Sequence, residues 1–283
     1  MLTMENINKL LNFGIINIDK PSGPTSFAIS NFIKKELNLK KTSHFGTLDP
    51  KVGGVLPIAL GRACRLTGFF LGHKKEYVGI LRTHKEIKKE DLQKIINENF
   101  VGKIKQLPPK KSRVKRKIRE KEVEFFKILE KEGKDFLFKI KVQGGTYIRK
   151  ICSDLGEIIG GAHMLELRRT MAGIFSEEKS ISLYEFEKAK EELKKENSLF
   201  LEKLITPAEE AIKKVFERIE LEKSSLERLK TGKFIKISDL KDKEDFKKIK
   251  EEIFAAFCED KFIGIYRKIN QNDEIARPEF VFN

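Results

Sequence analysis

Segments with the patterns of strands and of helices follow one another irregularly along the first 216 residues. An apolar run at 14–18 predicts a strand that ends in the turn-forming residues 19–24, and Thr25 or Ser26 can then cap a helix that extends to about Asn38. Because strands and helices do not alternate regularly, we expect an α+β fold, with a mixed sheet flanked by helices, rather than a doubly wound sheet. Later segments predict a strand at 76–82, a helix at 88–99 and a hairpin with strands at 122–130 and 135–143.

The pattern changes at about residue 217. Ser182 with Glu185, and Thr206 with Glu209, have the spacing of capping boxes and predict helices at about 183–203 and 207–216. Beyond these helices, short apolar runs indicate strands. We therefore expect three parts, which are an N-terminal segment at 1–12, a large domain at 13–216 and a small, mainly β domain at 217–283.

Positive charge is concentrated in one short segment. The chain has a formal charge of +15, which favours a polyanionic partner, either nucleic acid or an anionic membrane surface. Residues 110–121 carry eight basic side chains and one acid, whereas 241–252 carry five of each sign and predict a solvated helix face. A local excess of this kind is typical of a segment that follows a nucleic-acid backbone.

The cysteines and histidines are too few and too scattered to suggest a metal site. Three cysteines form no C-x-x-C pair and there are only four histidines, so we expect no metal, no cofactor and no disulfide framework. The N-terminus shows no signal-peptide pattern, and no stretch approaches the roughly 18 apolar residues of a membrane span. These features predict a cytoplasmic protein without a membrane partner.

The segment from His44 to Gly54 combines turn-forming residues with one carboxylate. Its glycines permit tight turns and the close approach of a ligand. Pro50 keeps Asp49 away from helical geometry, so the carboxylate is expected on an extended or turn backbone. Taken alone, such a segment is more often a plain turn than a site.

Five motifs in order, between residues 14 and 175, resemble those of the pseudouridine synthases of the TruB and dyskerin group. The segment around Asp49 is similar to the catalytic loop of that family, and the residues 14–26, 75–77, 144–149 and 165–170 match its other motifs. The proline-then-basic segment 108–117 is similar to the archaeal and eukaryotic dyskerin-like subunit of box H/ACA guide-RNA particles. The resemblance implies a pseudouridine-synthase catalytic domain followed by a C-terminal PUA domain.

The resemblance assigns catalysis to Asp49, either as a nucleophile at the sugar carbon or as the base that removes a sugar proton. Arg149 would hold this carboxylate ionised and oriented, and Tyr77 would stack on the base once it has left the RNA stack. Tyr147 lies two residues before Arg149, and we expect both side chains on one face of a strand. The chain has 22 phenylalanines but only 4 tyrosines, which favours a role for the two hydroxyls.

Further residues are expected to support the loop or to bind RNA. Lys20 and Pro21 would buttress the catalytic loop, and Leu167 would pack beneath the base. His44 would contact RNA or cap its own loop, and Phe45 replaces a usually small residue, so it is expected to affect entry of the nucleotide. The basic residues expected at RNA phosphates are Arg168 and Arg169, together with Arg113, Lys115, Arg116 and Lys117 of the basic segment.

The sequence therefore predicts an isomerase that converts uridines of rRNA or tRNA into pseudouridine. The finer resemblance implies a catalytic subunit that acts with a guide RNA, small Nop-family and Gar-type proteins and a kink-turn-binding ribosomal-type protein. Two alternatives stay open, which are a stand-alone enzyme that modifies the tRNA T-loop and a catalytically silent RNA-binding scaffold. The joint presence of Asp49, Tyr77 and Arg149 favours an enzyme over a scaffold. No paired-carboxylate metal motif suggests a nuclease.

Overall fold

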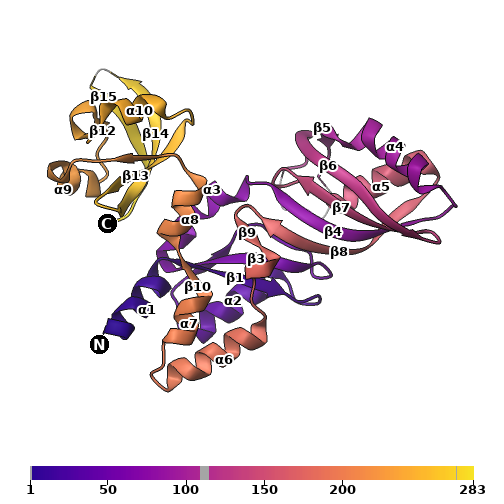
Figure 1. Cartoon of the computed structure of the whole chain (residues 1–283), viewed down its shortest axis with the longest axis horizontal. Coiled ribbons are helices and arrows are strands. Elements are labelled where there is room, and N and C mark those ends of the chain that lie inside the picture. Colours follow the sequence, from indigo (N-terminus) through magenta and orange to yellow (C-terminus); the bar gives the residue numbers. More distant parts are fainter. Residues whose placement is uncertain (1, 109–114, 272) are drawn as a thin grey trace. The chain divides into compact units, whose positions relative to one another are not determined.

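The computed structural model describes residues 2–108, 115–271 and 273–283. The chain divides into two compact units, 1–205 and 206–283, which are considered separately below (Figure 1). Arg113 and its neighbours at 109–114, for which a role in RNA binding is predicted, lie outside the described residues.

The first unit is built on one large mixed sheet. Its strand order is β10-β1-β3-β8-β4-β7-β6-β5, with β2 paired to β3 and β9 to β8. β3 and β8 run parallel, whereas the pairs β1–β3, β4–β8, β4–β7, β6–β7 and β5–β6 are antiparallel. The strands are β1 (Gly14–Lys20), β2 (Thr42–His44), β3 (Gly53–Leu60), β4 (Lys75–Thr83), β5 (Gly102–Gln106), β6 (Arg119–Glu132), β7 (Asp135–Val142), β8 (Ala162–Ala172), β9 (Phe175–Ser176) and β10 (Ile205–Pro207).

Helices flank this sheet and bury one apolar core with it. α4 packs on β6, α5 on β8 and α2 on β2, and the core between the layers includes the fully buried Ile33, Ile96, Phe138 and Leu155 (Figure 1). This architecture confirms the predicted α+β class. The helices are α1 (Leu2–Asn12), α2 (Ser26–Glu36), α3 (Thr67–Leu71), α4 (Lys89–Phe100), α5 (Ile148–Ile159), α6 (Leu183–Lys194) and α7 (Leu199–Leu204), with short 3-10 turns η1 (Gly61–Leu66) and η2 (Glu177–Lys179).

Some local expectations were right and others were wrong. Thr25 caps α2 by accepting a hydrogen bond from the Ala28 amide, and Ser182 with Glu185 forms the predicted capping box of α6. The helix expected at 183–203 is instead two helices, because the chain turns at Glu196, whose φ is 64°. The second predicted capping box is absent, since Thr206 lies in β10 and Pro207 precedes the next helix without a side-chain cap.

The strand expected around Tyr147 and Arg149 is the start of helix α5. Ile148, Ile151 and Leu155 recur at helical spacing and are all buried, so the helix is explained by its apolar face. Tyr147 is the N-cap residue and Arg149 lies in the first turn, which means that they do not share a strand face. The apolar spacing was visible in the sequence and was the missed signal.

The second unit is a small, mainly β body, as predicted. Its five-stranded sheet has the order β11-β13-β14-β15-β12. The mixed-charge run at 241–252 includes a short exposed helix, in which Lys247 pairs with Glu244 and Lys248 with Asp245. The elements are α8 (Ala208–Val215), β11 (Arg218–Glu220), η3 (Lys223–Ser225), α9 (Leu226–Lys230), β12 (Ile235–Lys236), η4 (Ile237–Asp239), α10 (Lys243–Lys248), β13 (Ile253–Cys258), β14 (Lys261–Gln271) and β15 (Glu274–Val281).

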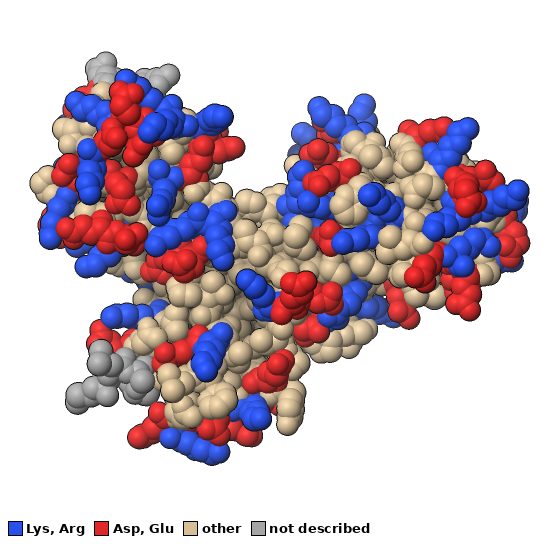
Figure 2. Space-filling model, viewed as in Figure 1, with Lys and Arg blue, Asp and Glu red and all other residues tan. Residues whose placement is uncertain are grey.

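Two properties of the whole chain can be stated from the described residues. None of the helices among them is long and apolar enough to cross a membrane. In the view of Figure 2, basic and acidic side chains are interspersed on both units. The net charge of +15 therefore does not collect on one continuous patch of the face in view.

The parallel contact between β3 and β8 predicts a strict requirement for glycine at position 54. Gly54 has φ +98°, and a Cβ there would lie 2.2 Å from the carbonyl oxygen of Arg169 on β8. Gly133, in the β6–β7 hairpin, also has a positive φ but has open space around it. We expect Gly54→Ala to lower the free energy of unfolding by about 1–3 kcal/mol more than Gly133→Ala, because only the former adds a steric clash. Denaturant unfolding of the two variants measures the difference, and equal losses would contradict the close approach.

Candidate active site

The Asp49 loop, residues 45–52 between β2 and β3, is held on its N-terminal side by a buried serine. Ser26, the first residue of α2, is fully buried. Its hydroxyl accepts a hydrogen bond from the Leu48 amide at 2.7 Å and donates to the Leu48 carbonyl oxygen at 3.0 Å. Since Leu48 directly precedes Asp49, the start of α2 fixes the backbone from which the Asp49 side chain extends.

The loop is held on its C-terminal side by the turn after β1. The buried ammonium of Lys20 donates to the carbonyl oxygens of Pro50 at 3.1 Å and Pro21 at 2.8 Å, and the Gly23 amide donates to Pro50 at 2.8 Å. Burial lowers the pKa of Lys20, the nearby Arg169 lowers it further and Asp49 opposes the shift. Lys20 and Pro21 thus lie under the loop, where a supporting role was expected, and Lys20 has no exposed surface with which to contact RNA.

Asp49 forms an ion pair with Arg149, 100 residues later in the sequence. Arg149 NH2 lies 3.0 Å from Asp49 Oδ2, and both side chains are more than half exposed. An exposed ion pair contributes little stability by itself, typically about 0–1 kcal/mol. The pair therefore depends on the rigid backbone on either side, and its exposure leaves the carboxylate accessible to a ligand.

Arg169 does not lie where a phosphate could reach it, so its predicted role in RNA binding is wrong for this structure. Its side chain is only 1% exposed. The guanidinium donates to the carbonyl oxygens of Val55 at 2.7 Å and Gly46 at 3.0 Å. Arg169 is a structural cation that holds β8 to β3 and to the start of the Asp49 loop. Burial lowers its pKa, whereas Tyr77 opposes this shift.

Tyr77 lies on β4, directly opposite Arg169 of β8. The residue is 8% exposed and belongs to the apolar core. The expected role of its hydroxyl stays a prediction.

His44 bonds within its own loop, and Phe45 packs in the core. The His44 ring lies 3.0 Å from the Thr47 hydroxyl, so it caps its own loop, and burial together with Arg169 lowers its pKa. Phe45 is 2% exposed and stacks on Phe70, with ring centroids 4.6 Å apart. The expected effect of Phe45 on nucleotide entry is therefore wrong, because its ring is part of the core.

The remaining predicted residues are spread around the site. Arg168 is partly exposed and bonds to Asp19 at 3.0 Å and to Glu177, so two carboxylates already compensate its charge. Leu167 is half-buried on β8, opposite Gly79 of β4. Tyr147 is half-buried at the start of α5. Lys115, Arg116 and Lys117 are exposed.

Sequence reasoning missed Lys75, a buried cation behind the site. Its ammonium donates to the carbonyl oxygens of Leu71 at 2.8 Å, His73 at 2.7 Å and Phe70 at 3.3 Å. Burial lowers the pKa of Lys75 to about 8, and the positive charges of Arg169 and Lys121 act in the same direction. The motif at 75–77 pointed to this lysine, but its burial could not be read from the sequence.

No cluster of three or more potential metal ligands occurs among the residues that the structure describes. The chemistry that these residues offer is therefore that of one accessible carboxylate. It is paired with one guanidinium, held on a rigid loop and backed by the buried Arg169, Lys20 and Lys75.

Comparison with known proteins places the chain among the pseudouridine synthases. Residues 34–148 match the N-terminal domain of the TruB family pseudouridylate synthases, and residues 149–213 match the C-terminal domain of tRNA pseudouridylate synthase B. A probable tRNA pseudouridine synthase B of Methanopyrus kandleri is 42% identical over 228 residues, which are 80% of this chain and 67% of the relative. The corresponding protein of Methanocaldococcus jannaschii is 47% identical over 178 residues, covering 62% of this chain and 53% of the relative. The chain thus spans between 53% and 67% of the length of these two curated relatives.

Two solved structures share the fold over nearly the whole chain. A chain in a Cbf5-Nop10-Gar1 complex is 34% identical, with a TM-score of 0.87 and coverage of 98% of this chain and 87% of that one. A chain of an H/ACA RNP bound to a substrate RNA that contains 2'-deoxyuridine is 32% identical, with a TM-score of 0.85 and the same coverage.

The two hydrogen bonds between Ser26 and the Leu48 backbone predict that Ser26 is needed for an ordered Asp49 loop. Ser26→Ala leaves a buried amide and a buried carbonyl without their partner, so we expect the free energy of unfolding to fall by about 1–3 kcal/mol. Amide hydrogen exchange at residues 46–50 should also accelerate. Ser22→Ala is the matched control, since the exposed Ser22 hydroxyl makes only a 3.3 Å hydrogen bond to Lys51. Equal exchange in both variants would contradict a clamping role for Ser26.

Proposed function

This chain belongs to the TruB family of pseudouridine synthases, and from that premise we propose that it isomerises uridines within RNA to pseudouridine. The observation that carries the proposal is the ion pair of Asp49 and Arg149, which two distant segments bring together in an accessible position. The family match covers both of these segments.

The reaction breaks the N-glycosidic bond of a uridine, turns the freed uracil and joins its C5 to the same sugar carbon. A carboxylate can attack that carbon as a nucleophile or remove a sugar proton as a base, and Asp49 takes one of these roles. Arg149 holds the carboxylate in one orientation at 3.0 Å. The chemistry needs one carboxylate and no redox step, which agrees with the groups that the loop presents.

The target nucleotide has to leave its stack before Asp49 can reach it. Tyr77 of β4 is the aromatic side chain that we assign to the face of the base, with Leu167 of β8 beneath it. Tyr147, the N-cap residue of α5, lies two residues before Arg149, and we assign it to the edge of the site.

We further propose that the chain acts as the catalytic subunit of a box H/ACA guide-RNA particle. The likeness to chains from a Cbf5-Nop10-Gar1 complex and from a substrate-bound H/ACA RNP supports this assignment. On this reading the partners are a guide RNA, its rRNA or tRNA substrate, small Nop-family and Gar-type proteins and a kink-turn-binding ribosomal-type protein, and the location is cytoplasmic. The predicted β domain 217–283, which lies within the second unit, would then serve as a PUA-like RNA-binding domain.

The second candidate function is that of a stand-alone tRNA enzyme. The names of the curated relatives, probable tRNA pseudouridine synthase B, favour this candidate. A silent RNA-binding scaffold is the third reading, and the accessible Asp49–Arg149 pair argues against it. Mapping of pseudouridine in tRNA and rRNA transcripts, with and without guide RNA, separates the three. A product that requires guide RNA identifies the particle subunit, and no product under any condition identifies the scaffold.

Asp49 supplies the carboxylate that the proposed reaction needs. Asp49→Asn is almost isosteric and removes the reactive carboxylate, so we expect no detectable isomerisation. RNA affinity should be equal or higher, because one negative charge that faces phosphates is lost. The matched control is Asp154→Asn on α5, where, among the residues that the structure describes, the acid pairs only with Lys150 of the same helix. Chemical mapping of pseudouridine and a binding assay measure both quantities, and substantial turnover by Asp49→Asn would overturn the assignment.

The exposed basic residues Lys115, Arg116 and Lys117 are expected to contact the RNA backbone. Each contact with a phosphate releases counterions, and the slope of log K against log salt changes by about 0.7–0.9 per contact. Replacing all three by alanine should therefore weaken binding to many RNAs alike and reduce the slope by about 2–3. The rate at saturating RNA should hardly change, because Asp49 and Arg149 remain.

A second triple variant controls for the loss of charge itself. Lys188, Lys194 and Lys195 belong to the mixed-charge α6 region and are not expected to follow RNA. Their replacement by alanine should leave the salt slope as in the wild type. If the variant of residues 115–117 also keeps the wild-type slope, these residues do not contact the phosphates of the RNA.

A further inference from the structure

Arg149 is placed by the turn that precedes α5. The helix begins at Ile148, its N-cap residue Tyr147 makes no side-chain capping bond, and Arg149 lies in the first turn. The position of Arg149 relative to Asp49 therefore depends on how the backbone from Gly144 to Tyr147 is held. Two side chains from the neighbouring hairpin hold it.

The first is Gln106, the last residue of β5, which is 3% exposed. Its Oε1 accepts a hydrogen bond from the Tyr147 amide at 3.1 Å, and its Nε2 donates to the Tyr147 carbonyl oxygen at 3.2 Å. A single side-chain amide thus binds both polar backbone groups of the N-cap residue. The same carbonyl accepts the first helical hydrogen bond, from the Ile151 amide, so Gln106 fixes the point from which the helix starts.

The second is Lys121 on β6. Its ammonium donates to the Gly144 carbonyl oxygen at 2.7 Å, and burial lowers its pKa. On the other side of the turn, a Cβ at position 144 would lie 2.2 Å from the Leu71 carbonyl oxygen. The turn is therefore confined between Lys121 and the end of α3, with no room for displacement toward α3.

Both anchors lie at the same end of one hairpin. Gln106 is paired with Arg119, and Lys121 lies two residues further along β6. An exposed ion pair such as Asp49–Arg149 is too weak to set its own geometry, so rigid supports have to set it. A displacement of about 1 Å at a reacting group can reduce a rate about 100-fold, which makes such supports functionally important.

We propose that Gln106 and Lys121 are positioning residues that hold Arg149 against Asp49 through the turn before α5. This inference rests on the proposed isomerase function and adds residues that act through Arg149 without touching the RNA base. Their removal should slow the chemical step while RNA binding is kept.

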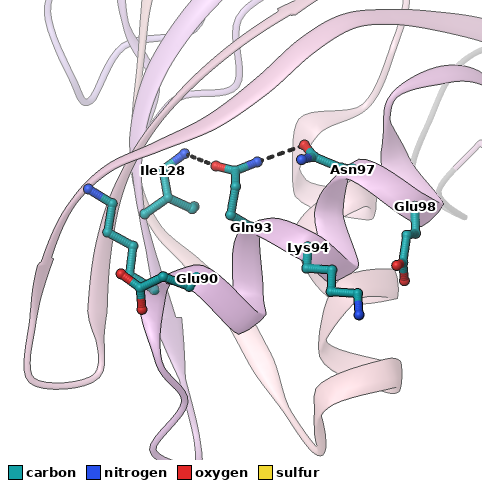
Figure 3. Close-up of a pocket in the computed structure, with 7 residues that line it drawn as sticks. Glu90, Gln93, Lys94, Asn97, Glu98 and Ile128 are labelled. Carbon is teal, nitrogen blue, oxygen red and sulfur yellow. Dashed lines mark hydrogen bonds between the residues drawn. The ribbon is translucent and has the colours of Figure 1, made fainter.

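The chain offers a close control for Gln106. Gln93 on α4 also binds backbone groups with both ends of its amide, since Oε1 accepts from the Ile128 amide at 2.7 Å and Nε2 donates to the Phe126 carbonyl at 2.9 Å. Figure 3 shows Gln93 joined to Ile128 and to Asn97. Gln93 therefore makes the same kind of contact with β6, but it does not contact the turn that carries Arg149.

The experiment compares Gln106→Met with Gln93→Met in the full chain, under the RNA and guide conditions that support wild-type turnover. We expect Gln106→Met to lower the single-turnover rate at saturating RNA about 10- to 100-fold with RNA affinity unchanged. Gln93→Met should lose a similar amount of thermal stability and keep the wild-type rate. Lys121→Met should behave like Gln106→Met, and Lys121→Arg, which keeps a donor for Gly144, should recover most of the rate.

Equal rates for Gln106→Met and Gln93→Met in an active wild-type background would overturn the inference and leave the proposed function standing. Absence of pseudouridine formation by the wild type under every condition would overturn the proposed function instead. Hydrogen exchange at the amides of Tyr147 and Ile151 tests the hydrogen bonds between Gln106 and Tyr147 independently of any activity assay. Faster exchange in Gln106→Met than in Gln93→Met supports it, and unchanged exchange overturns it.

Discussion

The buried guanidinium of Arg169 is the interaction on which the candidate site depends. A charge that is 1% exposed is costly to bury unless it is hydrogen-bonded on several sides. Val55 on β3 and Gly46 at the start of the Asp49 loop provide these bonds. Because the removal of either bond would leave polar groups unpaired in the core, the loop, β3 and β8 are held as one unit.

The rest of the site follows the same principle. Buried polar side chains bind the backbone next to Asp49 and Arg149, and the Asp49 carboxylate itself stays accessible. Ser26 holds Leu48, Lys20 holds Pro50 and Gln106 holds Tyr147, and each of these three side chains is at most 3% exposed. Asp49 and Arg149 are both more than half exposed. Rigid support from the interior therefore allows a weak surface ion pair to keep a defined geometry.

Local patterns were good predictors where one segment determines its own conformation. The strand expected at 14–18, which extends to Lys20, the helix from Ser26 and the hairpin around Gly133 were all found, because apolar periodicity and turn residues act within a few positions. The Asp49 loop and its pairing with Arg149 could be inferred from motifs that resemble a known family. The start of α5 was missed, because Tyr147 and Arg149 were assigned to a strand although Ile148, Ile151 and Leu155 have helical spacing.

The sequence by itself indicated the class of fold through its local apolar spacing, and it indicated the candidate catalytic residues only through motifs that resemble a known family. Only the tertiary structure decided how the adjacent Arg168 and Arg169 differ. Successive residues of a strand face opposite ways, and which face is buried depends on packing by distant elements. Arg169 binds a carbonyl 123 residues away, and Gln106 binds a backbone 41 residues away. Contacts over such separations exist only once the sheet has formed, so no local pattern encodes them.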